Sequence, residues 1–187
     1  MSKIFFTSDH HFGHANIIKF SNRPFLNVEE MNEVMIARWN EKIGPTDEVY
    51  HLGDFGITSP EEFQGIVYRL NGIIYLIVGN HEGSALGNRK RFKWIKEYHE
   101  IKIKDEERGN GVQRIVLFHY AMRVWRGDSR GTWHLYGHSH GNLPDLPHRL
   151  SFDVGVDAQN FYPLSYDEVK AIMKTKSWTQ SLEDEEI

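Results

Sequence analysis

Histidine, aspartate and asparagine side chains recur in short clusters along most of this sequence. The clusters are Asp9-His10-His11, Gly53-Asp54, Gly79-Asn80-His81-Glu82, His119 and Gly137-His138-Ser139-His140. Imidazole nitrogens bind Zn, Mn, Fe or Ni, whereas carboxylate and amide oxygens bind harder divalent ions. About seven such ligands are too many for one tetrahedral ion, and they match two ions that share a carboxylate. Two ions roughly 3.5–4 Å apart are a common arrangement for in-line attack on phosphate esters.

Each cluster directly follows a short apolar segment. These segments are residues 3–7, 48–52, 73–78, 114–118 and 133–136. They are rich in Ile, Val, Phe and Tyr, which favours buried strands over helices. In α/β proteins, sites form just beyond the carboxyl ends of the strands, where loops converge. All the clusters satisfy this rule, so we expect an α/β fold that gathers the ligands on loops at the strand ends.

Helices are expected between these strands. Asn27, Ser59 and Ser165 each precede a glutamate by three residues, which is the pattern of a capping box at a helix start. Residues 89–98 are also expected to be helical, because Phe92 and Ile95 have the spacing of one helix face.

The sequence Gly109-Asn110-Gly111 indicates a turn, and we expect it to join residues 100–104 and 112–117 into a hairpin.

Composition narrows the class of protein. The 187 residues fit one domain, which we place at residues 1–180, followed by an acidic tail at residues 181–187 that is expected to be frayed. The net charge of −4 does not favour long duplex nucleic acid. With no cysteine, thiolate ligands and disulfides are excluded. No segment approaches the roughly 20 apolar residues of a membrane span, and no signal-peptide core is present, so a cytoplasmic protein without a membrane partner is expected.

The order of the clusters resembles the calcineurin-like metallophosphoesterase superfamily. The shared pattern is Asp-x-His, Gly-Asp, Gly-Asn-His-Glu, a lone His and Gly-His-x-His, and it extends over residues 3–157. Residues 12–18 and Arg23-Pro24-Phe25 are similar to small stand-alone bacterial and phage members. The resemblance implies a two-sheet α/β sandwich flanked by helices, with two divalent ions per chain (Mn, Fe, Zn or Ni).

The resemblance also implies a role for each ligand. It places one ion on Asp9, His11 and His140. It places the other ion on Asn80, His119 and His138. Asp54 would bridge the two.

His81, by the same resemblance, would lie beside the scissile phosphate and act as general acid toward the leaving group, while water activated by the ions supplies the nucleophile. The protein-phosphatase branch follows Gly-Asp with Asp-Arg, whereas this chain has Phe55-Gly56. Phosphoprotein substrates are therefore not favoured, and no carboxylate that would orient His81 is identified.

Other polar residues near the clusters have two interpretations each. His14 could contact the phosphate or be a surface histidine. Arg123 and Trp125 follow His119, and arginine with an aromatic ring is a common means of binding phosphate and stacking a base; a solvated loop with one buried tryptophan would have the same composition. Arg23 is equally ambiguous. His10 is expected to face away from the ligands as a buried scaffold residue.

The expected activity is hydrolysis of a phosphate ester. A phosphodiester of a nucleotide or short nucleic acid is favoured, because the chain has no room for a capping domain and lacks the Asp-Arg pair. A phosphomonoesterase acting on small molecules and a metal-dependent nuclease remain alternatives. A binding module that has lost its metals is disfavoured, because all the ligand positions are intact. The sequence identifies no protein partner.

Overall fold

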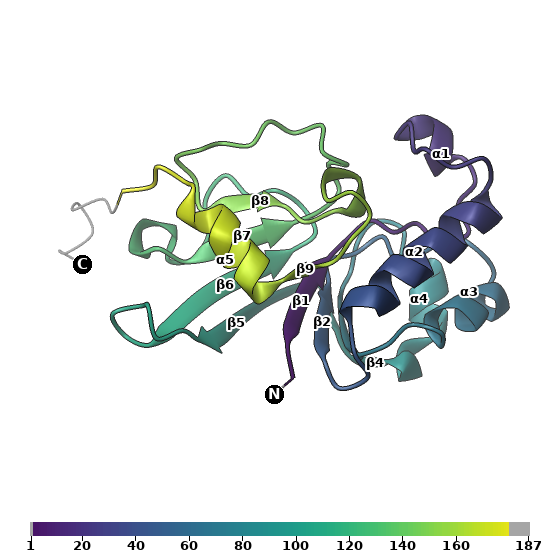
Figure 1. Cartoon of the computed structure of the whole chain (residues 1–187), viewed down its shortest axis with the longest axis horizontal. Helices are drawn as coiled ribbons and strands as arrows, with labels where there is room; N and C mark the ends of the chain where they lie inside the picture. Colours follow the sequence, from purple (N-terminus) through teal and green to yellow (C-terminus); the bar gives the residue numbers. More distant parts are fainter. Residues whose placement is uncertain (1, 180–187) are drawn as a thin grey trace.

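The structure is a computed structural model that describes residues 2–179. The acidic tail expected at residues 181–187 lies outside the described residues. The chain has a mixed α/β fold with two sheets, of five and four strands, and a few helices (Figure 1). The expected α/β class is confirmed. No helix in residues 2–179 is both long and apolar enough to cross a membrane.

The first sheet has the order β4-β3-β2-β1-β9. Its strands are β1 (Ile4–Thr7), β2 (Glu48–His51), β3 (Ile73–Ile77), β4 (Phe92–Lys96) and β9 (Leu164–Ser165). Strands β1 to β4 are parallel and β9 is antiparallel to β1. The loops that carry Asp9, Asp54 and Asn80 therefore leave the same edge of this sheet.

The second sheet has the order β5-β6-β7-β8. Its strands are β5 (Tyr98–Lys104), β6 (Val112–Phe118), β7 (Trp133–Tyr136) and β8 (Ser151–Asp153). Strands β5 and β6 form the predicted antiparallel hairpin, and β6, β7 and β8 are parallel. His119 follows the end of β6 and His138 follows the end of β7, so these ligands also leave a common edge.

The predicted helix starts are confirmed. The side chains of Asn27, Ser59 and Ser165 accept hydrogen bonds from the backbone N–H three residues later. The helices are α1 (Ile17–Phe20), α2 (Val28–Lys42), α3 (Pro60–Val67), α4 (Gly83–Gly87) and α5 (Tyr166–Lys174). Helices α1 to α4 lie together at the right of Figure 1, and α5 lies on the other half of the molecule.

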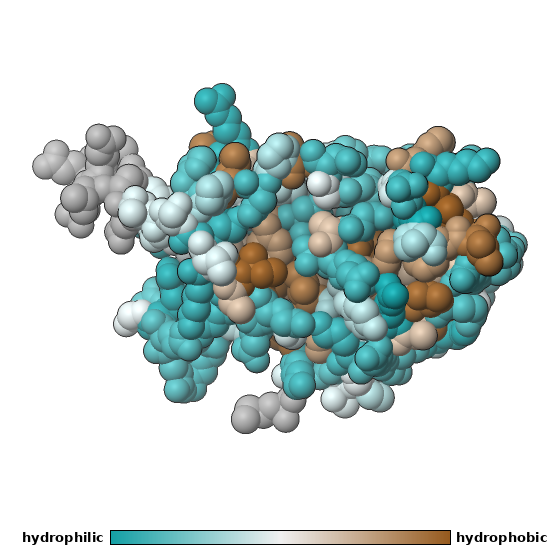
Figure 2. Space-filling view, turned by 45° about the horizontal axis from the view of Figure 1, so that its top comes forward, coloured by the Kyte–Doolittle hydropathy of each residue, from teal (hydrophilic) through white to brown (hydrophobic). Residues whose placement is uncertain are grey.

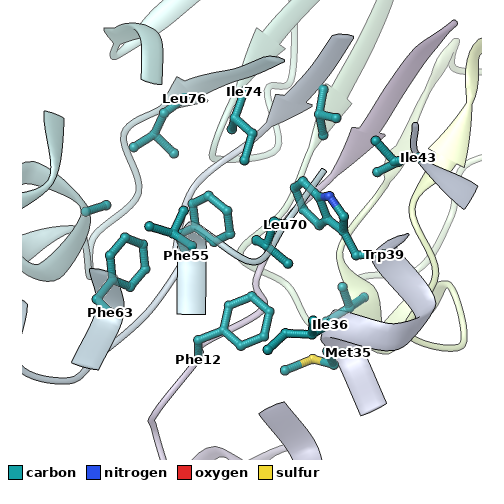
Figure 3. Close-up of a cluster of buried hydrophobic side chains, with 14 of the residues drawn as sticks. Phe12, Met35, Ile36, Trp39, Ile43, Phe55, Phe63, Leu70, Ile74 and Leu76 are labelled. Atoms are coloured by element: carbon teal, nitrogen blue, oxygen red, sulfur yellow. The ribbon is translucent and has the colours of Figure 1, made fainter. Parts of the chain in front are cut away.

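The structure has two hydrophobic cores, which pack the helices and the two sheets together. In the first, side chains of α2 face those of β3 across three phenylalanines (Figure 3); the labelled residues include Met35, Ile36, Trp39, Phe12, Phe55, Phe63, Ile74 and Leu76. The second core joins the two sheets, and α5 adds Val169 and Met173 to it. The face seen in Figure 2 is mostly hydrophilic, with separate apolar patches.

The expectation of a helix over residues 89–98 is wrong. A single 3₁₀ turn at Arg89–Arg91 leads directly into β4. Phe92 pairs with Ile74 and Ile95 with Leu76, so three residues of β4 span the same length as two of β3, with a bulge between them. The bulge brings Phe92 and Ile95 to the first core. Their three-residue spacing is that of a bulged strand and not of a helix face.

Candidate metal centre

Six of the predicted ligands form two clusters. They are Asp9, His11 and His140 in the first cluster, and Asp54, His119 and His138 in the second. Within each cluster the ligand atoms all lie within 4.8 Å of one another. Asn80 joins the second cluster, because its Oδ1 is 3.0 Å from Nε2 of His119. Loops from both sheets contribute to this centre.

Asp54 belongs to the second cluster and also faces the first. Its Oδ2 is 3.4 Å from Nε2 of His11 in the first cluster, and its Oδ1 is 3.7 Å from Nε2 of His119 in the second. Oδ1 also accepts a hydrogen bond of 2.8 Å from the backbone N–H of His81. A carboxylate whose two oxygens face different clusters has the geometry that a bridging ligand requires.

Five of the ligands have a left-handed backbone conformation. The φ angles are 59° at Asp9, 52° at His11, 56° at Asp54, 66° at His138 and 48° at His140. Such conformations are uncommon outside glycine and cost about 1 kcal/mol or more each. Backbone hydrogen bonds of 3.0 Å, from Asp9 N–H to Gly53 O and from His11 N–H to Asp54 O, hold two of these loops together. Strain concentrated at one set of loops is typical of a functional site.

Two motif glycines let the backbone approach the carboxylates. A Cβ at Gly79 would clash with Asp54, and a Cβ at Gly137 would clash with Ser8 and Asp9. Any side chain at these positions would therefore displace a ligand.

The buried groups of the first cluster fit a divalent cation. Burial raises the pKa of Asp9 to about 8, despite the neighbouring His140, and burial lowers the pKa of His11 to about 2. Neither ring nitrogen of His11 has a hydrogen-bond partner among residues 2–179. A buried carboxyl group and an unpartnered imidazole are costly when left uncompensated, and a cation bound to both would satisfy them.

Hydrogen bonds with backbone groups orient the ring of His119 and hold the loop of His138. Nδ1 of the buried His119 is 2.7 Å from the carbonyl oxygen of Leu52, so it donates there and leaves Nε2 to face Asn80 and Asp54. The backbone N–H of His138 donates to both oxygens of Asp9, at 3.1 and 2.9 Å. The two clusters are thus hydrogen-bonded to each other.

Comparison with known proteins gives the family of the chain. No protein-family model matches it. It is 34% identical to the uncharacterized protein MJ1445 of Methanocaldococcus jannaschii over 98% of both chains. The chain belongs to the MJ1445 family. The chain is also 27% identical to the gene 66 protein of Mycobacterium phage L5, and the match covers 84% of this chain and 88% of that protein.

A solved structure shares the fold. The protein of unknown function AQ665 from Aquifex aeolicus superposes with a TM-score of 0.68 at 22% identity, covering 92% of this chain and 100% of that chain. At this identity the likeness concerns the fold alone.

Arg23 and Asp157 form a buried hydrogen-bond network that contacts the first cluster. Asp157 Oδ2 is 2.6 Å from Nδ1 of His140, which leaves Nε2 of that ring for the cluster. Arg23 donates to both Asp157 oxygens, at 2.8 and 2.7 Å, and to the carbonyl oxygens of Asp9 and His10. Burial lowers the pKa of His140, but Asp157 and Asp9 outweigh it, so the net pKa is raised. The sequence left the role of Arg23 open. In the structure Arg23 is only 4% exposed, and its side chain hydrogen-bonds to the loop that carries Asp9 and His11.

Two further residues were given no role by the sequence. Asp157 belongs to none of the motifs and lies 134 residues from Arg23, so no local pattern identifies it. Glu82 ends the Gly-Asn-His-Glu motif, and its Oε1 accepts bonds of 3.3 Å from the N–H groups of Phe55 and Gly79. Burial and the nearby Asp54 raise the pKa of Glu82 to about 8. It holds the second and third ligand loops together.

His81 and His14 flank the first cluster. The exposed His81 ring lies 5.8 Å from the His11 ring and lines a hollow of about 380 Å³ with Gly56, Ile57 and Thr58. No group in residues 2–179 hydrogen-bonds to the His81 ring. The half-buried His14 ring lies 5.6 Å from that of His11, and burial and His81 lower its pKa. Both rings are near enough to meet a ligand of the cluster.

Of the two interpretations of the loop that carries Trp125, the structure supports the one with a buried tryptophan. Trp125 is 7% exposed, its Nε1 donates to the carbonyl oxygen of Thr132 at 2.9 Å, and the Arg149 guanidinium covers its ring at 4.8 Å. Its ring also lies 5.3 Å from the ring of His134, so these contacts are internal to the protein and the ring is used for packing.

Arg123, in contrast, is exposed. It lines a hollow of about 370 Å³ between the loops that follow His119 and His140, with Met122, Leu143 and Leu146 among its walls. His10 faces away from the ligands, as expected; it is fully buried, with Nδ1 3.0 Å from Nε2 of His51.

Proposed function

We propose that the chain is a dinuclear metal-dependent phosphoesterase with a metallophosphoesterase-like two-sheet sandwich. The observation that carries this proposal is the position of Asp54, whose two oxygens face separate Asp/His clusters. The first ion would be held by Asp9, His11 and His140. The second ion would be held by Asn80, His119 and His138. Mn, Fe, Zn and Ni all suit this mixed nitrogen and oxygen donor set.

The ions, when bound, supply Lewis-acid polarisation of the phosphoryl group and activate water. The chain's own residues supply the rest. His81 is exposed at a hollow beside the first cluster, where its ring can deliver a proton to the leaving oxygen. The Arg23–Asp157 pair keeps His140 oriented, and such outer contacts support ligand geometry.

We propose a phosphodiester as substrate. The hollow beside Arg123 combines its exposed guanidinium and the half-buried one of Arg149 with apolar walls, which suits a phosphate that carries a second organic group. A guanidinium can bind a non-bridging phosphate oxygen in a charge-assisted hydrogen bond, while Leu143 and Leu146 offer apolar contact. A nucleotide or a nucleic-acid fragment has both components.

A paired assay tests the proposal. Purified protein is supplied with Mn, Ni, Zn or Mg, and hydrolysis of bis-p-nitrophenyl phosphate is compared with that of p-nitrophenyl phosphate. We expect faster hydrolysis of the diester, loss of activity with a chelator, and the largest loss among single ligand changes for Asp54→Asn. Faster monoester turnover would make the chain a phosphomonoesterase. Hydrolysis of neither compound with any of the ions would contradict the proposal.

A further inference from the structure

Four arginines line a hollow at the far end of the second sheet from the metal centre. The hollow has a volume of about 270 Å³, and its arginines are Arg108, Arg114, Arg126 and Arg130. The β5–β6 hairpin and the 3₁₀ turn Asp128–Arg130 form its sides. The hairpin turn is at the left of Figure 1, an end of the molecule that appears largely hydrophilic in Figure 2.

The hollow is separate from the candidate metal centre. Val112, which lines it, is the first residue of β6, whereas His119 directly follows the last residue of that strand. At about 3.3 Å per residue, Val112 is roughly 20 Å from His119 along the strand, and Glu100, which also lines the hollow, pairs with Val116 about 10 Å from His119. None of the residues that line the hollow is a candidate metal ligand.

Positive charge is concentrated here without equal compensation. Among the described lining residues, Glu100 is the one acidic side chain, and it lies 3.3 Å from Arg126. Arg114 and Arg130 have no ion-pair partner within residues 2–179. Lys102 lies directly opposite Arg114 on the neighbouring strand, and like charges in this position destabilise a sheet. Such a cluster of positive charge is unexpected in a chain of net charge −4. A bound anion would relieve the repulsion between these side chains.

Internal hydrogen bonds preorganise the hollow. Arg108 Nη2 donates to the carbonyl oxygen of Gly131 at 3.3 Å, and Nε2 of the fully buried Gln113 donates to the same oxygen at 3.1 Å. Gly127 and Gly131 flank the 3₁₀ turn with φ angles of 75° and 80°. A Cβ at Gly131 would lie 2.6 Å from Arg108 Nη2. The glycine thus allows the guanidinium to pack against the turn.

We propose that this arginine hollow binds the phosphate groups of an anionic ligand. Guanidinium groups bind phosphate through paired N–H donors, which an ammonium cannot imitate. The hollow is smaller than the usual pocket for a drug-sized molecule, which favours a phosphate or diphosphate group over a bulky organic group. Free phosphates and the backbone of a single-stranded nucleic acid present this same chemistry.

Calorimetric titration of the full chain in excess chelator tests the proposal, because the chelator removes binding that depends on the metal centre. The probes are inorganic phosphate, pyrophosphate and a ten-nucleotide oligothymidylate at low salt. We expect pyrophosphate to bind more tightly than phosphate. Its affinity should fall as the salt concentration is raised. Arg114→Ala/Arg130→Ala should weaken binding about tenfold or more. Arg114→Lys, which keeps the charge, should also weaken it.

Arg89→Ala/Lys90→Ala is the matched control, because it removes two exposed positive charges from the 3₁₀ turn that leads into the first sheet. It should leave the affinity unchanged, and circular dichroism should show that all variants fold. Oligonucleotide binding that pyrophosphate displaces would identify nucleic-acid backbone as the source of the phosphate, and pyrophosphate binding alone would identify free phosphates. Failure of the wild-type chain to bind any probe, or equal weakening in the control, would overturn the proposal.

Discussion

Asp157 links a buried guanidinium to a predicted metal ligand. It accepts from Arg23 on one side and lies 2.6 Å from His140 Nδ1 on the other. A carboxylate in this position fixes the tautomer of the imidazole and increases its basicity. We therefore expect Asp157 to affect the affinity for the proposed first metal ion, although it belongs to neither cluster of ligand atoms.

Asp157→Asn should weaken binding of the first metal ion about 10–100-fold, which is the usual scale for loss of such a contact. Titration with Mn, followed by metal analysis, measures this. The fold is expected to persist with a lower melting temperature, because Arg23 keeps the Asp9 and His10 carbonyl partners. Asp167→Asn removes an exposed carboxylate from α5 and is the matched control. Equal affinity in both variants would show that Asp157 only supports the fold.

His81→Ala should retain both metal ions and slow turnover about 10²-fold or more, because the side chain is proposed to act as a positioned acid. The variant keeps the hydrogen bond from the backbone N–H of residue 81 to Asp54, which is proposed to bridge the ions. Rates for a diester with an alkoxide leaving group should fall further than rates for a p-nitrophenolate ester, which hardly requires a proton. An equal fall for both substrates would exclude His81 as the acid for the leaving group.

At the scale of elements, local signals were sufficient for some features and not for others. The caps at Ser59 and Ser165 follow from residues within one helical turn, and both capping boxes form. Strand β4 was missed because a bulge gives it a helix-like spacing of apolar residues. The Arg23–Asp157 pair was missed because its partners are brought together only by the complete fold. The six side chains that cluster in the fold were predicted to do so because each lies within four residues of the end of a strand.

Asp105 joins α5 to the turn of the β5–β6 hairpin. Its oxygens accept from Tyr166 Oη at 2.6 Å and from Lys170 Nζ at 2.7 Å. Burial alone would raise the pKa of Asp105, but these partners outweigh it and lower the pKa to about 2. Since the unfolded value is near 3.9, the stabilisation is complete above about pH 4 and is lost as the pH falls through about 2.

Asp105→Asn should therefore lower the free energy of unfolding by about 1–2 kcal/mol at pH 7. The difference from the wild type should shrink between pH 4 and pH 2. Urea unfolding at pH 7, 4 and 2.5 measures both effects. Glu106→Gln changes an exposed neighbour, with its side chain 87% accessible, and should have little effect at any of these pH values. A difference that does not depend on pH would mean that the Asp105 charge is not responsible.

At the scale of the whole molecule, the candidate metal centre connects the two sheets. Asp9, His11 and Asp54 come from loops of the first sheet, whereas His119 and His138 follow strands of the second. The arginine hollow lies at the other end of the second sheet. The two proposed sites share no residue, which allows each to be changed without substituting a residue of the other.

Metal binding should stabilise the entire chain, because ions bound at the centre are ligands of the folded state alone. At a free Mn concentration of about 100 times Kd, the gain is about 2.7 kcal/mol. For a protein of this length it corresponds to a rise in melting temperature of roughly 5–10 °C. The Asp54→Asn variant should lose most of this rise in melting temperature, because it lacks the negative charge that is proposed to face both ions. Arg69→Ala, at an exposed ion pair with Glu33, should retain the shift. An equal rise in the Asp54 variant and the wild type would place the bound metal elsewhere on the protein.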